Sequence, residues 1–400
     1  MSPTPVSMAV PTAPSGYVWE ATTEQVAARY GVPVERIVRF DLNTAAEPPG
    51  IALAALATGA FEGGLSEYPP SDYRRLVAAA ARRYGVAPYE LLVGAGADEV
   101  LDIIAKAFLP PGGAAVVPTP SYAMFRVLTD QRGARIVAVP RLGPDRGFAI
   151  DAPAVRAAGA DASVIWLCSP NNPTGLPEPD RAIATLLHGL RTDAAADGRQ
   201  APIVVLDEAY AEFVGTSLVG LRDRYPGLIV VRTVSKAYGL AGLRVGFAIA
   251  TSEVIAAMEP YRPPGSLSTV SVAVATAAFE DGDWLAPRVA AANAERERLA
   301  TALVAAGWAP HASVANFLLL PCGSPARAQA VADALLRRGL VPRTFGAGHP
   351  LVDHLRLTVR SPEQDDRLIE ALGVISTDSR AKAGAAPERS AQGSRAKAPR

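Results

Sequence analysis

The sequence predicts an α/β protein in which a large, mostly parallel sheet carries helices on both faces and a smaller α+β domain follows. Between about 91 and 250, short apolar runs alternate with amphipathic helical stretches, which is typical of successive strand and helix units. After Arg262-Pro263-Pro264-Gly265 this alternation stops and a long polar helix follows. The hydrophobic content of 49% over 400 residues is enough for one or two large cores.

Seven short apolar runs are the expected strands of the large domain. They are Leu91 to Val93, Ala114 to Val117, Arg135 to Val139, Val164 to Leu167, Ile203 to Leu206, Leu228 to Arg232 and Gly246 to Ile249. Asp98 to Phe108 is an expected helix, because its apolar residues recur on one face.

The region after the proline-rich break is expected to hold a helix over Asp281 to Ala306, strands near Phe317 and Leu355, and a closing helix over Pro362 to Leu372. From Ser376 onward the chain has no large apolar residue that could offset the entropy lost on ordering. The expected organisation is a disordered leader (1–16), an N-terminal segment packing with the small domain (17–42), a large domain (43–262), a small domain (263–375) and a disordered tail (376–400).

Composition and charge exclude several kinds of partner. The 39 basic and 39 acidic side chains leave a formal net charge of zero, whereas nucleic acids and anionic membranes attract basic surfaces. A small-molecule partner is therefore expected. Cys168 and Cys322 lie far apart without a CxxC pattern, which indicates neither a disulfide framework nor a zinc site and fits the cytoplasm. His311, His349 and His354 lack metal-binding spacing, so no metal is predicted.

Lysine is rare, and one lysine stands out by its position. Lys382 and Lys397 lie in the expected tail, and Lys106 falls outside the apolar stripe of its helix. Lys236 follows the strand Leu228 to Arg232, and ligands bind at the carboxyl ends of parallel strands. Because a lysine amine can lose its proton and attack a carbonyl while arginine cannot, Lys236 is the predicted nucleophile.

Two further motifs follow neighbouring strands. Ser169 to Gly175 reads SPNNPTG directly after the strand Val164 to Leu167, and Asp207 to Tyr210 reads DEAY directly after Ile203 to Leu206. Three strand ends therefore direct an amide, a carboxylate with a phenol, and an amine toward one crevice. Glu208 and Glu212, next to this motif, are expected to be structural.

Taken together, GAGADE, SPNNPTG, DEAY, SKAYGLAGLRVGF and LRLTV occur in the order and at roughly the spacing of the fold type I pyridoxal-phosphate aminotransferases. Within that superfamily the chain most resembles the histidinol-phosphate aminotransferases, from about Tyr17 to Leu372. The resemblance implies a homodimeric transaminase that binds pyridoxal 5'-phosphate. It also implies ping-pong transfer of an amino group between histidinol phosphate and 2-oxoglutarate in histidine biosynthesis.

The resemblance also assigns roles to single residues. Asp207 matches the carboxylate that holds the pyridine nitrogen, and Lys236 matches the lysine that forms the Schiff base and moves the proton at Cα. Asn172 and Tyr210 match donors to the phenolic oxygen, and Tyr122 matches the aromatic that stacks on the ring.

Phosphate and substrate positions are implied in the same way. The implied phosphate ligands are Gly96, Ala97 and Asp98 at a helix N-terminus, Ser235, Arg244, and Tyr68 reaching from the other subunit. The implied substrate contacts are Arg356 for the α-carboxylate, Asn172, Arg343 and Tyr17.

The chain departs from the family at two places. Ala45, Ala46 and Glu47 stand where relatives carry Asn-Glu-Asn, and Arg360 stands where they carry glycine. We expect Arg360 either to add an anion contact or to face water. Because these departures touch substrate choice, decarboxylation of threonine phosphate and a broader or aromatic aminotransferase stay open, and so does a cofactor-binding regulator without enzymatic activity.

Overall fold

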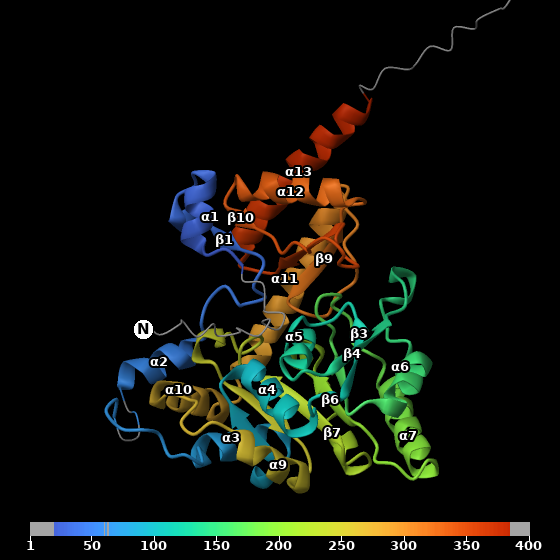
Figure 1. The fold of residues 1–400 in the computed structure, drawn as a ribbon. Helices are drawn as coiled ribbons and strands as arrows, with labels where there is room; N and C mark the ends of the chain where they lie inside the picture. The colour runs from blue at the N-terminus through green and yellow to red at the C-terminus, as the bar shows by residue number, and fades with distance from the viewer. Residues whose placement is uncertain (1–19, 60, 62–63, 385–400) are drawn as a thin grey trace, which may run out of the picture.

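A computed structural model describes residues 20–59, 61 and 64–384, so the expected leader lies outside the described residues. Within these ranges the chain forms a larger body around a seven-stranded sheet and a smaller body around two short two-stranded sheets (Figure 1). The α/β class and the smaller α+β region are therefore confirmed. No helix in the described ranges is long and apolar enough to cross a membrane.

All seven predicted strands are present, each within two residues of its expected bounds. They are β2 (Leu91–Gly94), β3 (Ala114–Thr119), β4 (Arg135–Pro140), β5 (Val164–Cys168), β6 (Ile203–Asp207), β7 (Leu228–Thr233) and β8 (Gly246–Ile249). Their order across the sheet is β2-β8-β7-β6-β5-β3-β4. Only β8 runs against its neighbours, β2 and β7, among these described strands.

Successive residues of each strand enter two different cores, because side chains alternate between the faces of a sheet. Val205 and Ile229 point into one core, and their neighbours Val204 and Leu228 point into the other. The first face is covered by α4 (Gly96–Phe108), α5 (Met124–Gln131) and α9 (Ser252–Met258). The second is covered by α2 (Gly50–Thr58), α3 (Arg74–Tyr84), α6 (Ala152–Ala158), α7 (Asp180–Ala196), α8 (Ala211–Val214) and α10 (Thr269–Glu280).

The boundary between the two bodies differs from the expected one at residue 263. Helix α10 packs against α2 and α3, and its Val274 and Ala275 are fully buried in the core of the larger body. A helix this apolar needs cover on several sides, and the larger body provides it. The chain leaves that body along α11 (Leu285–Ala305), which buries Leu285 in the larger core and Leu303 in the smaller one.

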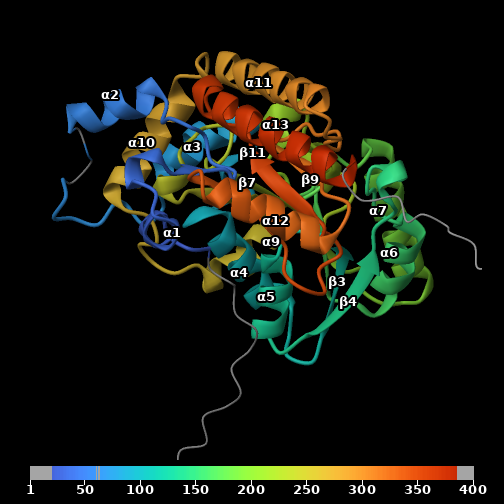
Figure 2. The ribbon, with the colours of Figure 1, turned by 90° about the horizontal axis from the view of Figure 1, so that it is seen from above.

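The smaller body combines segments from both ends of the chain. Its antiparallel pair is β9 (Phe317–Pro321) and β11 (His354–Thr358), and its parallel pair is β1 (Val38–Arg39) and β10 (Leu340–Val341). The helices are α1 (Thr23–Tyr30), α11, α12 (Pro325–Leu336) and α13 (Pro362–Gly384). Figure 2 shows α13 between α11 and α12, in agreement with its contacts to both.

Helix α13 is longer than predicted, because it ends at Gly384 instead of Leu372. Ile375 packs against the core of the smaller body, and Ser376 is buried. The alanine, arginine and lysine residues that follow in the sequence have high helix propensity, and adding residues to an existing helix is easy. Helix α13 therefore extends into the expected tail as far as Gly384, and the remainder of the tail lies outside the described residues.

Candidate active site

A cavity of about 250 Å³ lies at the carboxyl ends of β5, β6 and β7. It is lined by Leu42, Thr44, Ala97, Asp98, Tyr122, Cys168, Asn172, Asp207, Ala209, Tyr210, Thr233, Ser235, Lys236, Ala241 and Arg244. Of the residues predicted to hold the cofactor, all but Gly96 and Tyr68 belong to this set. Three motifs that are far apart in the sequence thus meet in one cavity, as the strand order predicts.

Asp207 ends β6 at the floor of the cavity. Its Oδ1 accepts a hydrogen bond of 2.9 Å from the Ala209 backbone N–H, and its side chain is buried. Burial raises the pKa of this carboxyl to about 7, because a charged group loses its hydration in the interior. A cationic N–H facing Asp207 would restore the stabilisation that the carboxylate loses on burial. The carboxylate would in turn keep that nitrogen protonated.

Lys236 follows β7 and is fully enclosed. Burial, together with the positive charge of Arg356, lowers the pKa of its amine to about 8. Its Nζ lies 5.8 Å from the centre of the Tyr210 ring. About a tenth of Lys236 is therefore uncharged at pH 7, far more than for an ordinary lysine, and an uncharged amine is the form that attacks a carbonyl.

One end of the cavity is built for an anion. Helix α4 begins there, and its first backbone N–H groups carry the positive end of the helix dipole. Arg244 Nη2 lies 3.3 Å from Asp98 Oδ2, and Tyr122 Oη donates to Asp98 Oδ1 at 2.7 Å. The cation, the helix end and Ser235 together form a site suited to phosphate.

Two glycines make this end possible. Gly96 has φ +83°, and a Cβ there would lie 2.4 Å from Arg244 Nη2. At Gly246, in β8, a Cβ would lie 2.4 Å from the backbone carbon of Gly96. The start of α4 can approach the sheet, and Arg244 can cross it, only because both positions lack a side chain.

The opposite side of the cavity joins the two bodies. Arg356, in β11, donates from Nη1 to Asn172 Oδ1 at 2.6 Å and from Nη2 to the Asp41 carbonyl at 2.5 Å. Its guanidinium lies over the Phe317 ring, 5.4 Å from the centre. A predicted cofactor ligand and a predicted carboxylate clamp are therefore in direct contact.

The polar residues behind the cavity are structural, as expected for Glu208 and Glu212. Both accept from buried Arg232, at 2.8 and 2.6 Å. Arg232 also lies over the Tyr84 ring at 5.0 Å. Because Glu208 adjoins Asp207 and Arg232 lies near the end of β7, the strand before Lys236, this buried ion cluster holds the two motifs in one relative position.

Residues 40–372 match the family model described as "Aminotransferase class I and II". The chain belongs to this aminotransferase family. The match covers both bodies, including the cavity and the strand that carries Arg356, so it agrees with the predicted resemblance.

Relatives of this aminotransferase share most of its length. Histidinol-phosphate aminotransferase of Roseiflexus castenholzii is 40% identical over 359 residues, 87% of this chain and 92% of the relative. The protein of the same name in Symbiobacterium thermophilum is 36% identical, over 86% and 94%. The crystal structure of histidinol-phosphate aminotransferase from Sinorhizobium meliloti with pyridoxal-5'-phosphate superimposes with a TM-score of 0.80 at 26% identity, covering 90% and 96%.

The cavity of this aminotransferase fits a pyridoxal phosphate by the chemistry of its walls. Asp207 offers a buried carboxylate for a ring N–H, and Lys236 offers an amine with a lowered pKa for the aldehyde. Because Gly96 has no Cβ, Arg244 can lie close to the start of α4, and together they offer a cation and backbone N–H groups for the phosphate. An aromatic wall for the ring is provided by Tyr122.

Among the described residues, four predicted site residues are not part of the cavity lining: Gly96, Tyr68, Arg343 and Arg356. Tyr68 is 89% exposed. Arg343 pairs its side chain with Glu20, and its backbone bridges to Arg356. Tyr17 lies outside the described residues.

Arg360 behaves differently from both expectations. Its Nη1 donates to the carbonyls of Thr44, at 2.9 Å, and Ala45, at 3.1 Å. The side chain therefore neither faces water nor stands ready for an anion.

Seven residues of the site were not predicted: Leu42, Asn43, Thr44, Cys168, Ala209, Thr233 and Ala241. All of these except Asn43 line the cavity, while Asn43 Nδ2 donates to Tyr210 Oη at 2.9 Å. Asn43 has φ +52°, a conformation that asparagine tolerates better than most residues. The motif LNTAAEPPG contains three of them, but nothing local in it indicates which side chains face the site.

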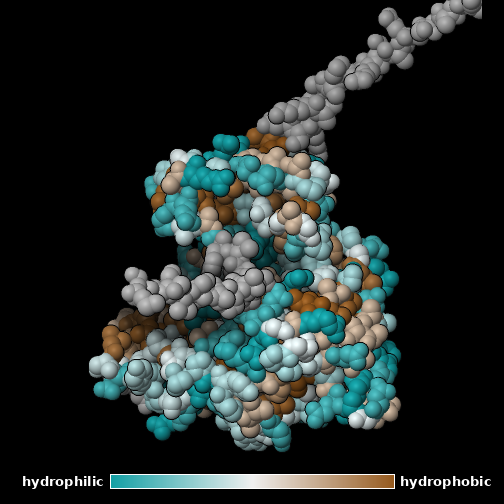
Figure 3. All heavy atoms as spheres, in the orientation of Figure 1, coloured by the Kyte–Doolittle hydropathy of each residue, from teal (hydrophilic) through white to brown (hydrophobic). Residues whose placement is uncertain are grey.

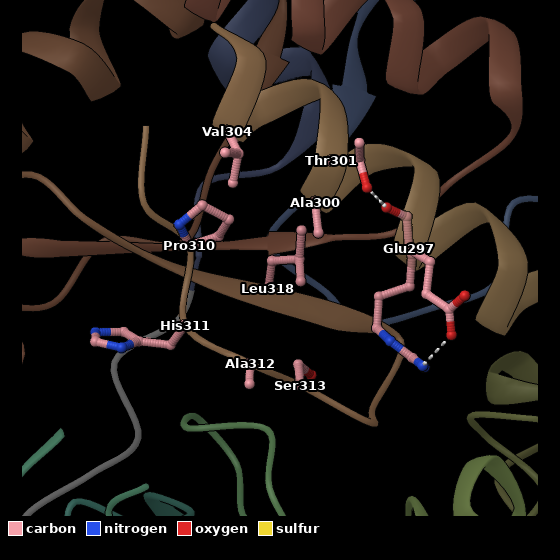
Figure 4. A pocket seen from close by; sticks show the side chains of 10 residues that line it. Glu297, Ala300, Thr301, Val304, Pro310, His311, Ala312, Ser313 and Leu318 are labelled. Atoms are coloured by element: carbon pink, nitrogen blue, oxygen red, sulfur yellow. Dashed lines mark hydrogen bonds and ion pairs between the residues drawn. The ribbon is translucent and has the colours of Figure 1, made fainter. Parts of the chain in front are cut away.

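A second hollow, in the smaller body, is larger but lacks this chemistry. Its volume is about 410 Å³, and Figure 4 shows Val304, Pro310, His311 and Leu318 around it. None of the described residues predicted for cofactor or substrate lines it. The described residues also contain no group of three or more His, Cys, Asp and Glu side chains that could hold a metal.

Proposed function

We propose that the protein is a pyridoxal-phosphate-dependent histidinol-phosphate transaminase of histidine biosynthesis, with 2-oxoglutarate as acceptor. The observation that carries the proposal is the meeting of Lys236, Asp207 and the Arg356–Asn172 pair around one cavity with an anion site at its end. The names of relatives at 36–40% identity over most of the chain support the substrate.

Each residue then has one task. The bound cofactor supplies an electron sink conjugated to the substrate Cα. Asp207 keeps the pyridine nitrogen protonated, and Tyr210 donates to the phenolic oxygen. Lys236 would hold the cofactor through its amine and, once that amine is free, would move the proton at the substrate Cα. Arg356 binds the carboxylate of the oxo acid in its bidentate fork.

We further propose a homodimer in which Tyr68 enters the partner's cavity. Tyr68 is 89% exposed, and Leu65 nearby is 76% exposed. Leu53 and Leu56 of α2 are also exposed, and Figure 3 shows apolar side chains gathered over this helix. Exposed apolar residues beside an unengaged site residue support an interface there.

The same proposal places the enzyme in the cytoplasm. Its two cysteines, Cys168 and Cys322, are both free and buried. This state suits a reducing compartment.

A donor panel tests the function directly. The purified protein with pyridoxal phosphate is given histidinol phosphate, threonine phosphate, or phenylalanine, and conversion of the cofactor to its amino form is followed by absorbance. We expect conversion with histidinol phosphate, and initial-rate lines with 2-oxoglutarate that run parallel. Release of CO₂ from threonine phosphate would indicate a threonine-phosphate decarboxylase instead. Preference for phenylalanine would indicate a broader or aromatic aminotransferase.

A further inference from the structure

The strand that carries Arg356 also holds a segment of the N-terminal chain along one face. Arg356 donates to the Asp41 carbonyl, and two residues later the Thr358 backbone N–H donates to the Phe40 carbonyl at 2.8 Å. Thr358 Oγ1 in turn accepts from the Asn43 backbone N–H at 2.9 Å. Alternate residues of an extended chain share one face, so the next position in this row is Arg360.

Arg360 continues the row with its guanidinium. One nitrogen, Nη1, reaches the carbonyls of both Thr44 and Ala45, and Nε donates to Gln364 Oε1 at 3.2 Å. The Arg360 backbone N–H is bound by the Asp365 carboxylate at 3.1 Å. The arginine is therefore anchored at both ends by α13 while its side chain holds the segment.

A second arginine clasps the segment from the other side. Arg288, in α11, donates to the Glu47 carbonyl. A Cβ at Gly239, in the loop after Lys236, would lie 2.4 Å from Arg288 Nη2 and 3.2 Å from the Ala45 Cβ. Arg360 and Arg288 thus hold the chain from Thr44 to Glu47 against the Lys236 loop through its carbonyls, and Arg360 Nη1 also donates to Thr44 Oγ1 at 3.2 Å.

This segment is a wall of the active site. Leu42 and Thr44 line the cavity, and Asn43 between them donates to Tyr210 Oη. Ala45 and Ala46 have no polar side chains that could hold the wall in place. Asn316 and Thr358 hold the wall at Asn43, and the arginines hold it at the carbonyls that follow.

We propose that Arg360 is a positioning residue that holds the wall formed by residues 42–45 against the cavity, replacing the anchoring that Ala45 and Ala46 cannot provide. The part of this proposal that concerns substrate affinity rests on the proposed function. The structural part does not, because the contacts join residues of the chain to one another.

Amide hydrogen exchange of the cofactor-free protein tests the structural part. Arg360→Ala should speed exchange of the amides of 43–47 by roughly tenfold or more, since their neighbours lose a charged donor. Arg360→Lys should lie between wild type and Arg360→Ala, because an ammonium lacks the planar fork. Unchanged exchange at 43–47 in Arg360→Ala would overturn the proposal.

Arg367→Ala is the matched control. Arg367 Nη2 also donates to a main-chain carbonyl of the N-terminal segment, that of Arg36, at 2.8 Å, but far from the cavity. Its removal should leave exchange at 43–47 at the wild-type rate. Equal acceleration in both variants would show general loosening of the smaller body and would also overturn the proposal.

Kinetics test the consequence for substrates. In Arg360→Ala, KM should rise roughly tenfold for amino donor and oxo acid alike, with a smaller effect on kcat, because both use the same wall. Histidinol phosphate and histidinol should be affected by the same factor. A rise confined to the phosphate donor, with exchange unchanged, would assign Arg360 to anion binding instead. If the wild-type protein turns over neither donor, the proposed function fails, while the exchange result still decides the role of Arg360.

Discussion

Asn43 Nδ2 donates a hydrogen bond of 2.9 Å to Tyr210 Oη, joining residues 167 positions apart in the chain. The phenol therefore receives one donor from the N-terminal segment and keeps its own O–H for a ligand in the cavity. Burial raises the pKa of Tyr210, so Tyr210 remains protonated and can donate. The contact links the wall formed by residues 42–45 directly to the catalytic machinery.

Replacing Asn43 should weaken catalysis more than folding. In Asn43→Ala the buried Tyr210 Oη loses its donor and can turn toward other acceptors, so we expect kcat/KM to fall by roughly 5- to 50-fold. Steady-state kinetics with the best donor measure this change. A variant with wild-type kcat/KM would show that the contact does not orient the phenol.

The lowered pKa of Lys236 should be visible in cofactor capture. Covalent attachment of pyridoxal phosphate needs the neutral amine, so its rate in cofactor-free protein should rise with pH and be half-maximal near pH 8. Stopped-flow absorbance follows the reaction, and borohydride reduction followed by peptide mass locates the link. Lys236→Arg should show neither link nor turnover, because arginine stays protonated. A link formed at another lysine would contradict the assignment.

Asp207 should make the stability of the cofactor-free protein depend on pH. Its folded pKa of about 7 lies above the ordinary value of 3.8, so between these values the folded state holds a proton that the unfolded state has released. The free energy of unfolding should therefore fall as pH rises from about 4 to 7.

Asp207→Asn removes this titration. Denaturant unfolding at several pH values measures the effect. Between about pH 4 and 7, the free energy of unfolding should fall by roughly 2–4 kcal/mol less in the variant than in wild type. Turnover of the loaded variant should nevertheless fall by a factor of about 100 or more, because a neutral amide cannot keep the pyridine nitrogen protonated. Equal pH profiles in wild type and variant would exclude Asp207 as the source.

A methyl group at Gly246 should damage the phosphate end. The new Cβ would lie 2.4 Å from the Gly96 backbone, so Gly246→Ala must displace the start of α4. We expect roughly a tenfold weaker Kd for pyridoxal phosphate and a loss of about 1–3 kcal/mol in stability. Fluorescence titration and thermal melts measure both.

Gly242→Ala is the control for this change. Gly242 lies in the same connection between β7 and β8, and its Cβ would meet nothing within 4 Å. It should bind the cofactor like wild type. Matching losses in both variants would mean that the effect is not steric crowding of α4.

Local sequence determined the larger sheet and the centre of the site. Strands such as β6 and β7 are continuous apolar runs, and such a run identifies a buried parallel strand from the local sequence alone. Parallel strands also place their carboxyl ends together. Asp207 and Lys236 follow those runs directly, so their meeting could be predicted from order and spacing.

The tertiary structure alone decided the wall formed by residues 42–45 and what holds it. Asn43 reaches Tyr210, and Arg360 reaches the Thr44 carbonyl across 316 positions, through contacts that exist only once the smaller body has packed on the N-terminal segment. The main-chain carbonyls that Arg360 and Arg288 bind are present at every residue, so no residue type marks them in the sequence. Helix α10 and the end of α13 were decided in the same way, because what a helix packs against depends on the neighbours that the fold brings to it.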